Sequence, residues 1–287
     1  MPFQPALSRV AVLGTGLIGG SFGLAVRAAF PHVHVTGWDR PEILGRAVAR
    51  GAVTDSSADL FSAVATADLV YIALPVGGII QHLPEIERAA RPGALITDAG
   101  GTKVAICRVA AREFGREKLF IGGHPIAGRE SGGIENAAAD LFRGAKYALI
   151  GDGSEPRAAR FAGFLQDTLG AEPVWLDAET HDWAVAVVSH LPQLVSVALA
   201  GVVLDETDET GLPAALAGAG LRDLARLAGS PYDIWRDICL TNSDNISRAL
   251  DRVIQALDHL RRNLSTRELE KEFTAANTLY KILHKIE

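Results

Sequence analysis

Val10-Ala11-Val12-Leu13 followed by Gly14-Thr15-Gly16-Leu17-Ile18-Gly19 is the stretch that decides the fold. The apolar run predicts a buried strand, and the GxGxxG pattern directly after it opens a helix predicted over residues 16–29. The first glycine permits a tight turn, the second lets the backbone approach a pyrophosphate, and the third lets helix pack on strand. Free N–H groups and the dipole at the helix N-terminus then attract the anion. We therefore predict a dinucleotide site whose contacts are Gly14, Thr15, Gly16, Leu17, Ile18 and Gly19.

A carboxylate stands at the end of the next predicted strand, residues 34–38. Asp39 follows Gly19 by about 20 residues, the spacing at which an acidic side chain accepts hydrogen bonds from the adenosine ribose. It would repel a 2′-phosphate, so the sequence favours NAD over NADP, although the adjacent Arg40 softens that preference. In the alternative interpretation, Asp39 is a solvated turn residue and the glycines serve packing alone.

Strands and helices alternate through the first part of the chain. Further strands are predicted over residues 68–74, 94–98, 120–123, 147–150 and 173–176, and helices over residues 41–50, 78–90, 102–114 and 155–169. Apolar strands between helices predict an α/β fold, a Rossmann-type doubly wound parallel sheet covered on both faces. We assign this domain to residues 1–176. Leu74 and Pro75 end one of its strands and are expected at the cleft edge, where such sheets bind ligands.

The pattern changes after Asp177, where strand signals almost disappear. Helices are predicted over residues 180–204, 216–228, 232–262 and 266–286. We assign residues 177–287 to an all-helical domain, because amphipathic helices of this length are expected to pack as a bundle.

Composition excludes several classes of protein. The chain has 287 residues and a net charge of −6, without a block of basic residues, so we expect no nucleic-acid partner. Its two cysteines, Cys107 and Cys239, lack metal-ligand spacing, and no metal site is expected. The apolar runs are interrupted by Gly, Asp or His, so we expect no membrane span, and the N-terminus lacks a signal-peptide pattern. These features predict a cytoplasmic protein.

Gly122-Gly123-His124-Pro125-Ile126-Ala127-Gly128-Arg129-Glu130 is the strongest candidate for catalysis. His124 follows a predicted strand and lies in a loop made rigid by Pro125. A histidine there can act as general base on a substrate hydroxyl. It could equally serve only to satisfy backbone groups of the loop.

Two further candidates lie in the helical half. Ser189-His190-Leu191-Pro192 interrupts an apolar helix, which Pro192 is expected to kink. His190 is a candidate for the site, or a satisfied core residue. Arg226 follows Arg222 by four residues and could bind a substrate carboxylate through its guanidinium fork.

Several of these motifs together resemble the prephenate/arogenate (cyclohexadienyl) dehydrogenases over roughly residues 8–262. The resemblance is carried by the GxGxxG stretch, Asp98-Ala99-Gly100-Gly101-Thr102-Lys103, Gly123-His124-Pro125-Ile126-Ala127-Gly128 and Ser189-His190-Leu191-Pro192. It implies NAD-dependent oxidative decarboxylation of prephenate to 4-hydroxyphenylpyruvate in tyrosine biosynthesis, or of arogenate to tyrosine. It also implies a homodimer formed through the helical domain, and leaves open inhibition by tyrosine at the active site.

The resemblance implies roles for individual residues. His124 matches the catalytic base and His190 a second active-site histidine, while Arg226 matches the arginine that binds a substrate carboxylate. Glu130 and Trp235 match residues at the mouth of the site. Many members have Ser where this chain has Gly101, so Thr102 or a water would replace that hydroxyl, or the contact is missing. Arg129 fills a variable position that is expected to touch the substrate side chain.

Two alternatives remain. Another Rossmann dehydrogenase, of the 3-hydroxyacid or imine-reductase type, would use a catalytic lysine in the helical half. The candidates Lys271, Lys281 and Lys285 lie close to the C-terminus, and Lys103 lies in the first domain. A non-catalytic NAD sensor is the second alternative, and the presence of His124 argues against it.

Overall fold

A computed structural model describes residues 7–115, 117–128, 132–207, 210–266 and 268–285. The chain forms two compact units, Met1–Ser243 and Asp244–Glu287. The predicted boundary between residues 176 and 177 rests on a different criterion, the change from α/β to helical pattern. It stays a prediction.

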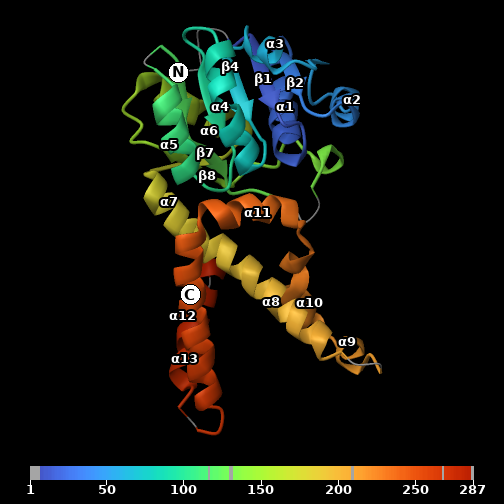
Figure 1. Ribbon diagram of the computed structural model, residues 1–287, viewed down its shortest axis with the longest axis vertical. Coiled ribbons are helices and arrows are strands. Elements are labelled where there is room, and N and C mark those ends of the chain that lie inside the picture. The colour runs from blue at the N-terminus through green and yellow to red at the C-terminus, as the bar shows by residue number, and fades with distance from the viewer. Residues whose placement is uncertain (1–6, 116, 129–131, 208–209, 267, 286–287) are drawn as a thin grey trace. The chain divides into compact units, whose positions relative to one another are not determined.

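The main sheet of the first unit has six parallel strands in the order β3-β2-β1-β4-β5-β6 (Figure 1). Its strands are β1 (Arg9–Leu13), β2 (His34–Trp38), β3 (Asp55–Ser56), β4 (Leu69–Ile72), β5 (Leu95–Asp98) and β6 (Leu119–Ile121). This is the strand order of doubly wound dinucleotide-binding folds, in which ligands bind where the order reverses. The predicted Rossmann-type sheet is confirmed, and the reversal lies between β1 and β4.

Helices cover both faces of this sheet. They are α1 (Leu17–Ala29), α2 (Pro41–Ala49), α3 (Leu60–Val64), α4 (Val76–Ala89), α5 (Val104–Glu113) and α6 (Pro156–Leu169). Two separate apolar cores result, because alternate side chains of a strand point to opposite faces. One core contains Phe22 of α1 and Phe161 of α6, and the other contains Ile79 of α4 and Ile106 of α5.

A second, smaller sheet was not predicted. Its strands are β7 (Gly123–Pro125), β8 (Lys146–Ile150) and β9 (Glu172–Leu176), and β7 runs antiparallel to β8. The prediction of one strand over residues 120–123 was wrong, because β6 ends at Ile121 and Gly123 starts β7. The cause is long-range: the side chains of Asp98 and Lys103 bind the backbone N–H and C=O of Gly123 and turn the chain away from β6.

The helical part of the first unit begins with one long rod. It consists of α7 (Ala178–Val185), a π-helical turn η2 (Ala186–His190) and α8 (Leu191–Asp205). A π-helical turn contains one residue more than an α-helical turn, and such turns are frequent at functional sites. It ends two residues before Pro192, the residue predicted to kink this helix.

This rod corrects one expectation. Ala178–Asp205 is long and apolar enough to cross a membrane, with a mean hydropathy of 1.9 over a window of which 17% is buried. The expectation that polar residues interrupt every such run was wrong, because the helix continues through His190 and Pro192 with few charges.

A 3₁₀ turn, η1 (Ile134–Asn136), comes before the rod in the chain. Short elements follow the rod: α9 (Leu212–Ala215), α10 (Ala219–Ala225), η3 (Arg226–Gly229) and α11 (Tyr232–Thr241). The second unit contains α12 (Ser243–Arg262) and α13 (Glu270–His284), joined by a hydrogen bond of 2.8 Å between His259 and Glu272. The single helix predicted over residues 232–262 was wrong, since Asn242 separates α11 from α12.

Candidate functional site

Each of the three glycines of the fingerprint is required for a different structural reason. Gly14 has a φ of +87°, and a Cβ there would lie 2.4 Å from the carbonyl oxygen of Ala73. A Cβ on Gly19 would lie 1.8 Å from the carbonyl oxygen of Gly14, so only glycine lets α1 approach β1. A Cβ on Gly16 would meet nothing within 4 Å, at a helix N-terminus that has no side-chain cap. The first and third glycines thus serve the fold, while Gly16 keeps space open where an anion would bind.

Asp39 lies at the end of β2, beside this turn. One of its carboxylate oxygens accepts hydrogen bonds from the backbone N–H and the hydroxyl of Thr15, at 2.7 and 3.2 Å. The other oxygen accepts the N–H of Arg40 at 2.7 Å. The side chain of Arg40 is exposed and lies 3.7 Å from Glu42. The carboxylate is therefore held at the cleft edge by its neighbours, in a position where a ribose could reach it.

A cleft of about 340 Å³ begins at the fingerprint. One wall is formed by Gly16, Leu17, Ile18, Leu74 and Pro75. It continues past Ala99, Gly100 and Gly101 at the end of β5. The opposite wall comes from α11 through Ile234 and Ile238, which sequence reasoning missed although their spacing of four residues marks one helix face. These residues fit a dinucleotide: an apolar slot whose lining includes the uncapped N-terminus of α1, with Asp39 bound to Thr15 of the same turn.

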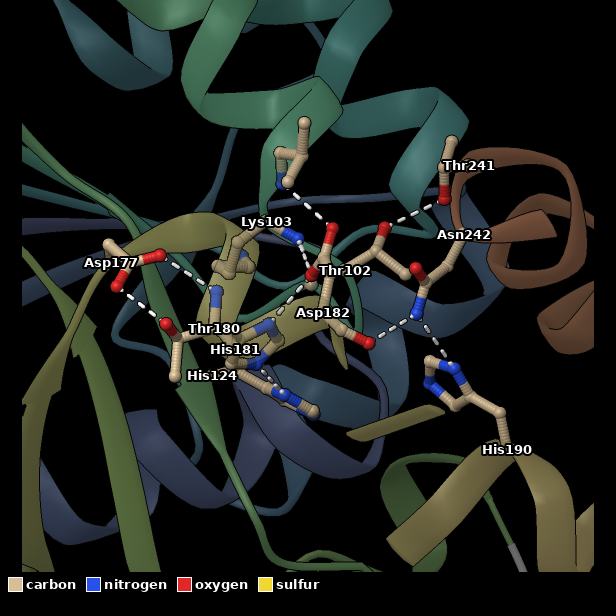
Figure 2. Close-up of polar contacts among 12 residues, drawn as sticks. Thr102, Lys103, His124, Asp177, Thr180, His181, Asp182, His190, Thr241 and Asn242 are labelled. Atoms are coloured by element: carbon tan, nitrogen blue, oxygen red, sulfur yellow. Dashed lines mark hydrogen bonds and ion pairs between the residues drawn. The ribbon is translucent and has the colours of Figure 1, made fainter. Parts of the chain in front are cut away.

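His124 lies on β7, with its imidazole Nδ1 2.9 Å from Nε2 of His181 on α7 (Figure 2). Nδ1 of His181 is 2.7 Å from Oδ1 of Asp182. The two side chains of α7 are each 1% exposed. Burial, followed by the charges of His181, Lys103 and His190, holds the pKa of His124 well below its ordinary value. The ring of His124 is therefore unprotonated near neutral pH, as a general base must be.

A buried ion pair fixes the strand that carries His124. The ammonium of Lys103 binds the carboxylate of Asp98 and donates to the carbonyl oxygen of Gly123 at 2.8 Å. Asp98 also accepts the N–H groups of Gly123 and Gly100, at 3.0 and 2.8 Å. Both charged side chains are fully buried. Because a buried charge needs its partner, this pair locks the start of β7 against the end of β5.

His190 ends the π-helical turn, where it is buried. Its Nδ1 lies 3.3 Å from the amide nitrogen of Asn242, which donates at 2.7 Å to the backbone carbonyl of Asp182. The indole of Trp235 packs edge-on against the ring, with centroids 5.9 Å apart. Burial lowers the pKa of His190 to about 4. The structure thus brings His190 and Trp235 together and places both near the residues behind His124.

The hydroxyl of Thr102 is directed elsewhere than to His124. It lies 2.7 Å from the hydroxyl of Thr241 on α11, and Thr102 is buried. A Cβ on Gly101 would lie 3.2 Å from Cδ1 of Ile238, so a side chain there would press on α11. The suggested substitution of Thr102 for the missing serine hydroxyl gains no support from this contact.

Arg226 begins the 3₁₀ turn η3, and its side chain is exposed. The turn is anchored on α8 by two buried polar side chains. Gln193 donates to the carbonyl oxygen of Leu227 at 2.8 Å, and Ser196 accepts the N–H of Ala228 at 3.0 Å. Sequence reasoning missed both anchors, because a single polar residue in an apolar helix does not reveal its partner.

Two predicted site residues, Arg129 and Glu130, lie outside the described residues. Among the residues that are described, no three His, Cys, Asp or Glu side chains are grouped so that they could hold a metal ion. His181 and Asp182 are the main residues that sequence reasoning missed. The dipeptide was read as part of an ordinary helix start, and only an unusually polar pair in an otherwise apolar helix could have marked it.

Two family models match the chain. Residues 22–168 match the nucleotide-binding domain of prephenate dehydrogenase, and residues 177–280 match the dimerization domain of prephenate dehydrogenase. A prephenate dehydrogenase from Lactococcus lactis is 32% identical over 264 residues, which are 91% of this chain and 73% of that protein.

Solved structures agree with these matches. The crystal structure of prephenate dehydrogenase from Aquifex aeolicus in complex with hydroxyphenyl propionate and NAD+ has a TM-score of 0.85 and 25% identity, covering 98% of this chain and 99% of that one. Synechocystis arogenate dehydrogenase has a TM-score of 0.78 and 28% identity, covering 97% of this chain and 100% of that one. These proteins share the fold and the order of domains over nearly the full chain.

Proposed function

Because the chain belongs to the prephenate dehydrogenase family, we propose that it catalyses the NAD-dependent oxidative decarboxylation of prephenate to 4-hydroxyphenylpyruvate. One observation carries the proposal: His124, an unprotonated histidine with Nδ1 already bound, belongs to the same unit as the dinucleotide cleft. Among the described residues, the hydrogen-bond partner of its ring lies at Nδ1, which leaves Nε2 for a substrate hydroxyl.

The residues of the chain divide the work as follows. Gly16 and the N-terminus of α1 hold the pyrophosphate of the cofactor, and Asp39 holds its adenosine ribose. When bound, NAD supplies the hydride acceptor. His124 accepts the proton of the ring hydroxyl at Nε2, a contribution on the order of 10²–10⁴ in rate.

The remaining candidates position the substrate. Arg226 supplies a cation for a carboxylate, and Trp235 and His190 border the site. The lowered pKa of His190 makes it a neutral hydrogen-bonding group rather than a second cation. Loss of the ring carboxylate as carbon dioxide then restores aromaticity, which makes the reaction irreversible. Arg129 and Glu130 remain candidates for contacts to the substrate side chain.

Arogenate is the alternative substrate, because an arogenate dehydrogenase is among the similar structures. The two substrates differ in an amine or a keto oxygen on the side chain. A 3-hydroxyacid dehydrogenase would need a lysine at the substrate, but the ammonium of Lys103 is buried against Asp98 and Gly123. Lys271 and Lys281 lie on α13 of the second unit.

A homodimer is part of the proposal. Large apolar side chains of the rod are exposed: Val188 of η2 at 70%, and Val202 and Leu204 of α8 at 60% and 72%. A second copy of the chain would cover them, and residues 177–280 match a dimerization domain. A bilayer is a poorer occupant, because the same rod carries Asp182, His181 and His190, which are expensive in hydrocarbon. We therefore place the protein in the cytoplasm. As a separate point, tyrosine is a candidate inhibitor at the active site.

The test is the formation of NADH by purified protein with prephenate and with arogenate in parallel. The variant His124→Asn should lose turnover by at least 100-fold while binding NAD normally, and the exposed His32→Asn serves as its matched control. Turnover of arogenate alone would show that arogenate, and not prephenate, is the substrate. No turnover of either compound by protein that binds NAD would contradict the proposal.

A further inference from the structure

A general base needs only a free ring nitrogen, but His124 is also the first member of a series of hydrogen-bonded side chains. It runs from His124 to His181 and then to Asp182, with contacts of 2.9 and 2.7 Å. Asp182 is held in turn by two backbone N–H groups at the start of α5: Lys103 donates to Oδ1 at 2.7 Å and Val104 to Oδ2 at 2.9 Å. Figure 2 shows this series of contacts as dashed lines from His124 to His181 and on to Asp182.

These contacts determine which ring nitrogens carry hydrogen. Both oxygens of Asp182 accept backbone N–H groups, so the side chain is present as an acceptor, and Nδ1 of His181 must donate to it. In neutral His181, Nε2 is then an acceptor. Nδ1 of His124 must donate to it, which leaves Nε2 of His124 without hydrogen.

We propose that His181 and Asp182 are positioning residues that hold His124 in the tautomer with a bare Nε2 and receive the proton that His124 takes from the substrate. This inference rests on the proposed function for its substrate, but the tautomer itself is a property of the free protein. Neither residue touches the reacting atoms; both act through His124.

The proton transfer balances within the chain. The O–H bond of the substrate breaks and an Nε2–H bond forms on His124. The Nδ1–H bond of His124 then breaks and an Nε2–H bond forms on His181, so the positive charge comes to rest beside the carboxylate of Asp182. After product leaves, the Nε2–H bond of His181 breaks and an Nδ1–H bond forms again on His124, while the Nε2–H bond of His124 breaks and its proton goes to solvent.

The charged groups around His124 favour this direction. Burial of the ring opposes a positive charge on it, and so does the ammonium of Lys103 at the start of α5. His181 has Asp182 as its direct partner on α7. A charge on His181 is thus paired with a carboxylate, whereas the carboxylate of Asp98, which binds Gly123 next to His124, is already paired with Lys103.

The first test is ¹⁵N NMR of the imidazoles in the free protein, assigned by comparison with His124→Asn and His181→Asn. We expect both rings to carry hydrogen at Nδ1 and not at Nε2 at neutral pH. Hydrogen at Nε2 of His124 would overturn the inference whatever the activity of the protein. Because no substrate is present, this result is independent of the proposed function.

The second test is a set of variants followed by pH profiles of kcat. Asp182→Asn can keep its amide oxygen toward Nδ1 of His181, but it removes the negative charge beside a protonated His181 and sets its NH2 group against the N–H of Val104, so it should lower kcat at least about tenfold. His181→Gln can still accept from His124 and donate to Asp182, so it should keep the tautomer, lose the relay and lower kcat about tenfold. His181→Leu should lose both the tautomer and the relay, and its kcat should fall further.

The matched control is Glu179→Gln, which removes an exposed carboxylate from the same helix. It should leave kcat and its pH profile unchanged. Equal kcat for His181→Gln and the unmodified protein would overturn the relay, and equal kcat for His181→Leu would overturn the positioning role. If Asp182→Asn fails to fold, as melting temperature would show, the two His181 variants and the NMR measurement still decide the question.

Discussion

Gln193 on α8 donates a hydrogen bond of 2.8 Å to the backbone carbonyl of Leu227, the residue after Arg226. The rod and the turn that carries the proposed carboxylate ligand are thereby joined through one buried amide. Gln193→Leu should raise KM for prephenate about tenfold and leave kcat within threefold. It should also cost about 1–3 kcal/mol of stability, because the carbonyl loses its donor. Steady-state kinetics and denaturant unfolding measure both; the exposed Gln166→Leu is the control, and an unchanged KM would contradict the role.

His190 should make stability depend on pH in a known direction. Burial lowers its pKa from 6.5 to about 4, so the unfolded chain binds the proton more readily than the folded one. The stability that neutral His190 contributes to the folded protein is fully present above pH 6.5 and is lost as pH falls through about 4. The loss in unfolding free energy is about 3 kcal/mol. Unfolding in denaturant between pH 7 and 4 should therefore show a smaller decline for His190→Asn than for the unmodified protein or His32→Asn. Parallel declines would refute this.

Gly16 and Gly19 should respond differently to the same substitution. Gly19→Ala places a methyl group 1.8 Å from a carbonyl oxygen and should cost about 3 kcal/mol or more, if the protein folds. Gly16→Ala adds a methyl group in open space, so the melting temperature should change little while NAD affinity falls at least tenfold. Calorimetric titration with NAD checks this, and unchanged affinity of Gly16→Ala would show that the cofactor does not approach there.

Asp39 should set the preference for NAD. Asp39→Ser removes the carboxylate at the cleft edge and should weaken NAD binding by about 10- to 100-fold, the value of a hydrogen bond to a charged group. NADP binding should improve, because the repulsion is removed and Arg40 is exposed nearby. The ratio of dissociation constants is the readout, with Asp55→Asn as a control on the neighbouring strand. A ratio that does not move would assign Asp39 to the turn alone.

Gly101→Ser should be coupled to α11. The new Cβ would lie 3.2 Å from Cδ1 of Ile238, so we expect a loss of about 1 kcal/mol that Ile238→Val largely restores. A double-mutant cycle of unfolding free energies measures this coupling. Strictly additive effects would mean that α11 does not rest on the end of β5 in solution.

The sequence was informative where the pattern is local. The strand predicted over residues 34–38 matches β2, and the fingerprint correctly predicted the turn between β1 and α1. The glycines could be read because their chemistry is a property of a single short segment. His124 was likewise found because it follows a strand between glycines.

What the sequence could not reveal depends on distant partners. The break between β6 and β7 comes from Asp98 and Lys103, which hold Gly123 from another part of the chain. The break between α11 and α12 falls at Asn242, whose amide is bound to Asp182 and His190. The same limit hid the His181–Asp182 pair, because a polar pair at a helix start looks like a solvated surface.

The π-helical turn from Ala186 to His190 places a constraint on the length of the gene as well as on its codons. Each residue of an α-helix rotates the chain by about 100° around the axis. Deleting one codon within this turn would restore ordinary α-helix, but it would also rotate Gln193 and Ser196 away from η3 relative to His181. The two halves of the rod would then face different neighbours. Related sequences should therefore tolerate substitutions in this segment far better than single-residue deletions or insertions.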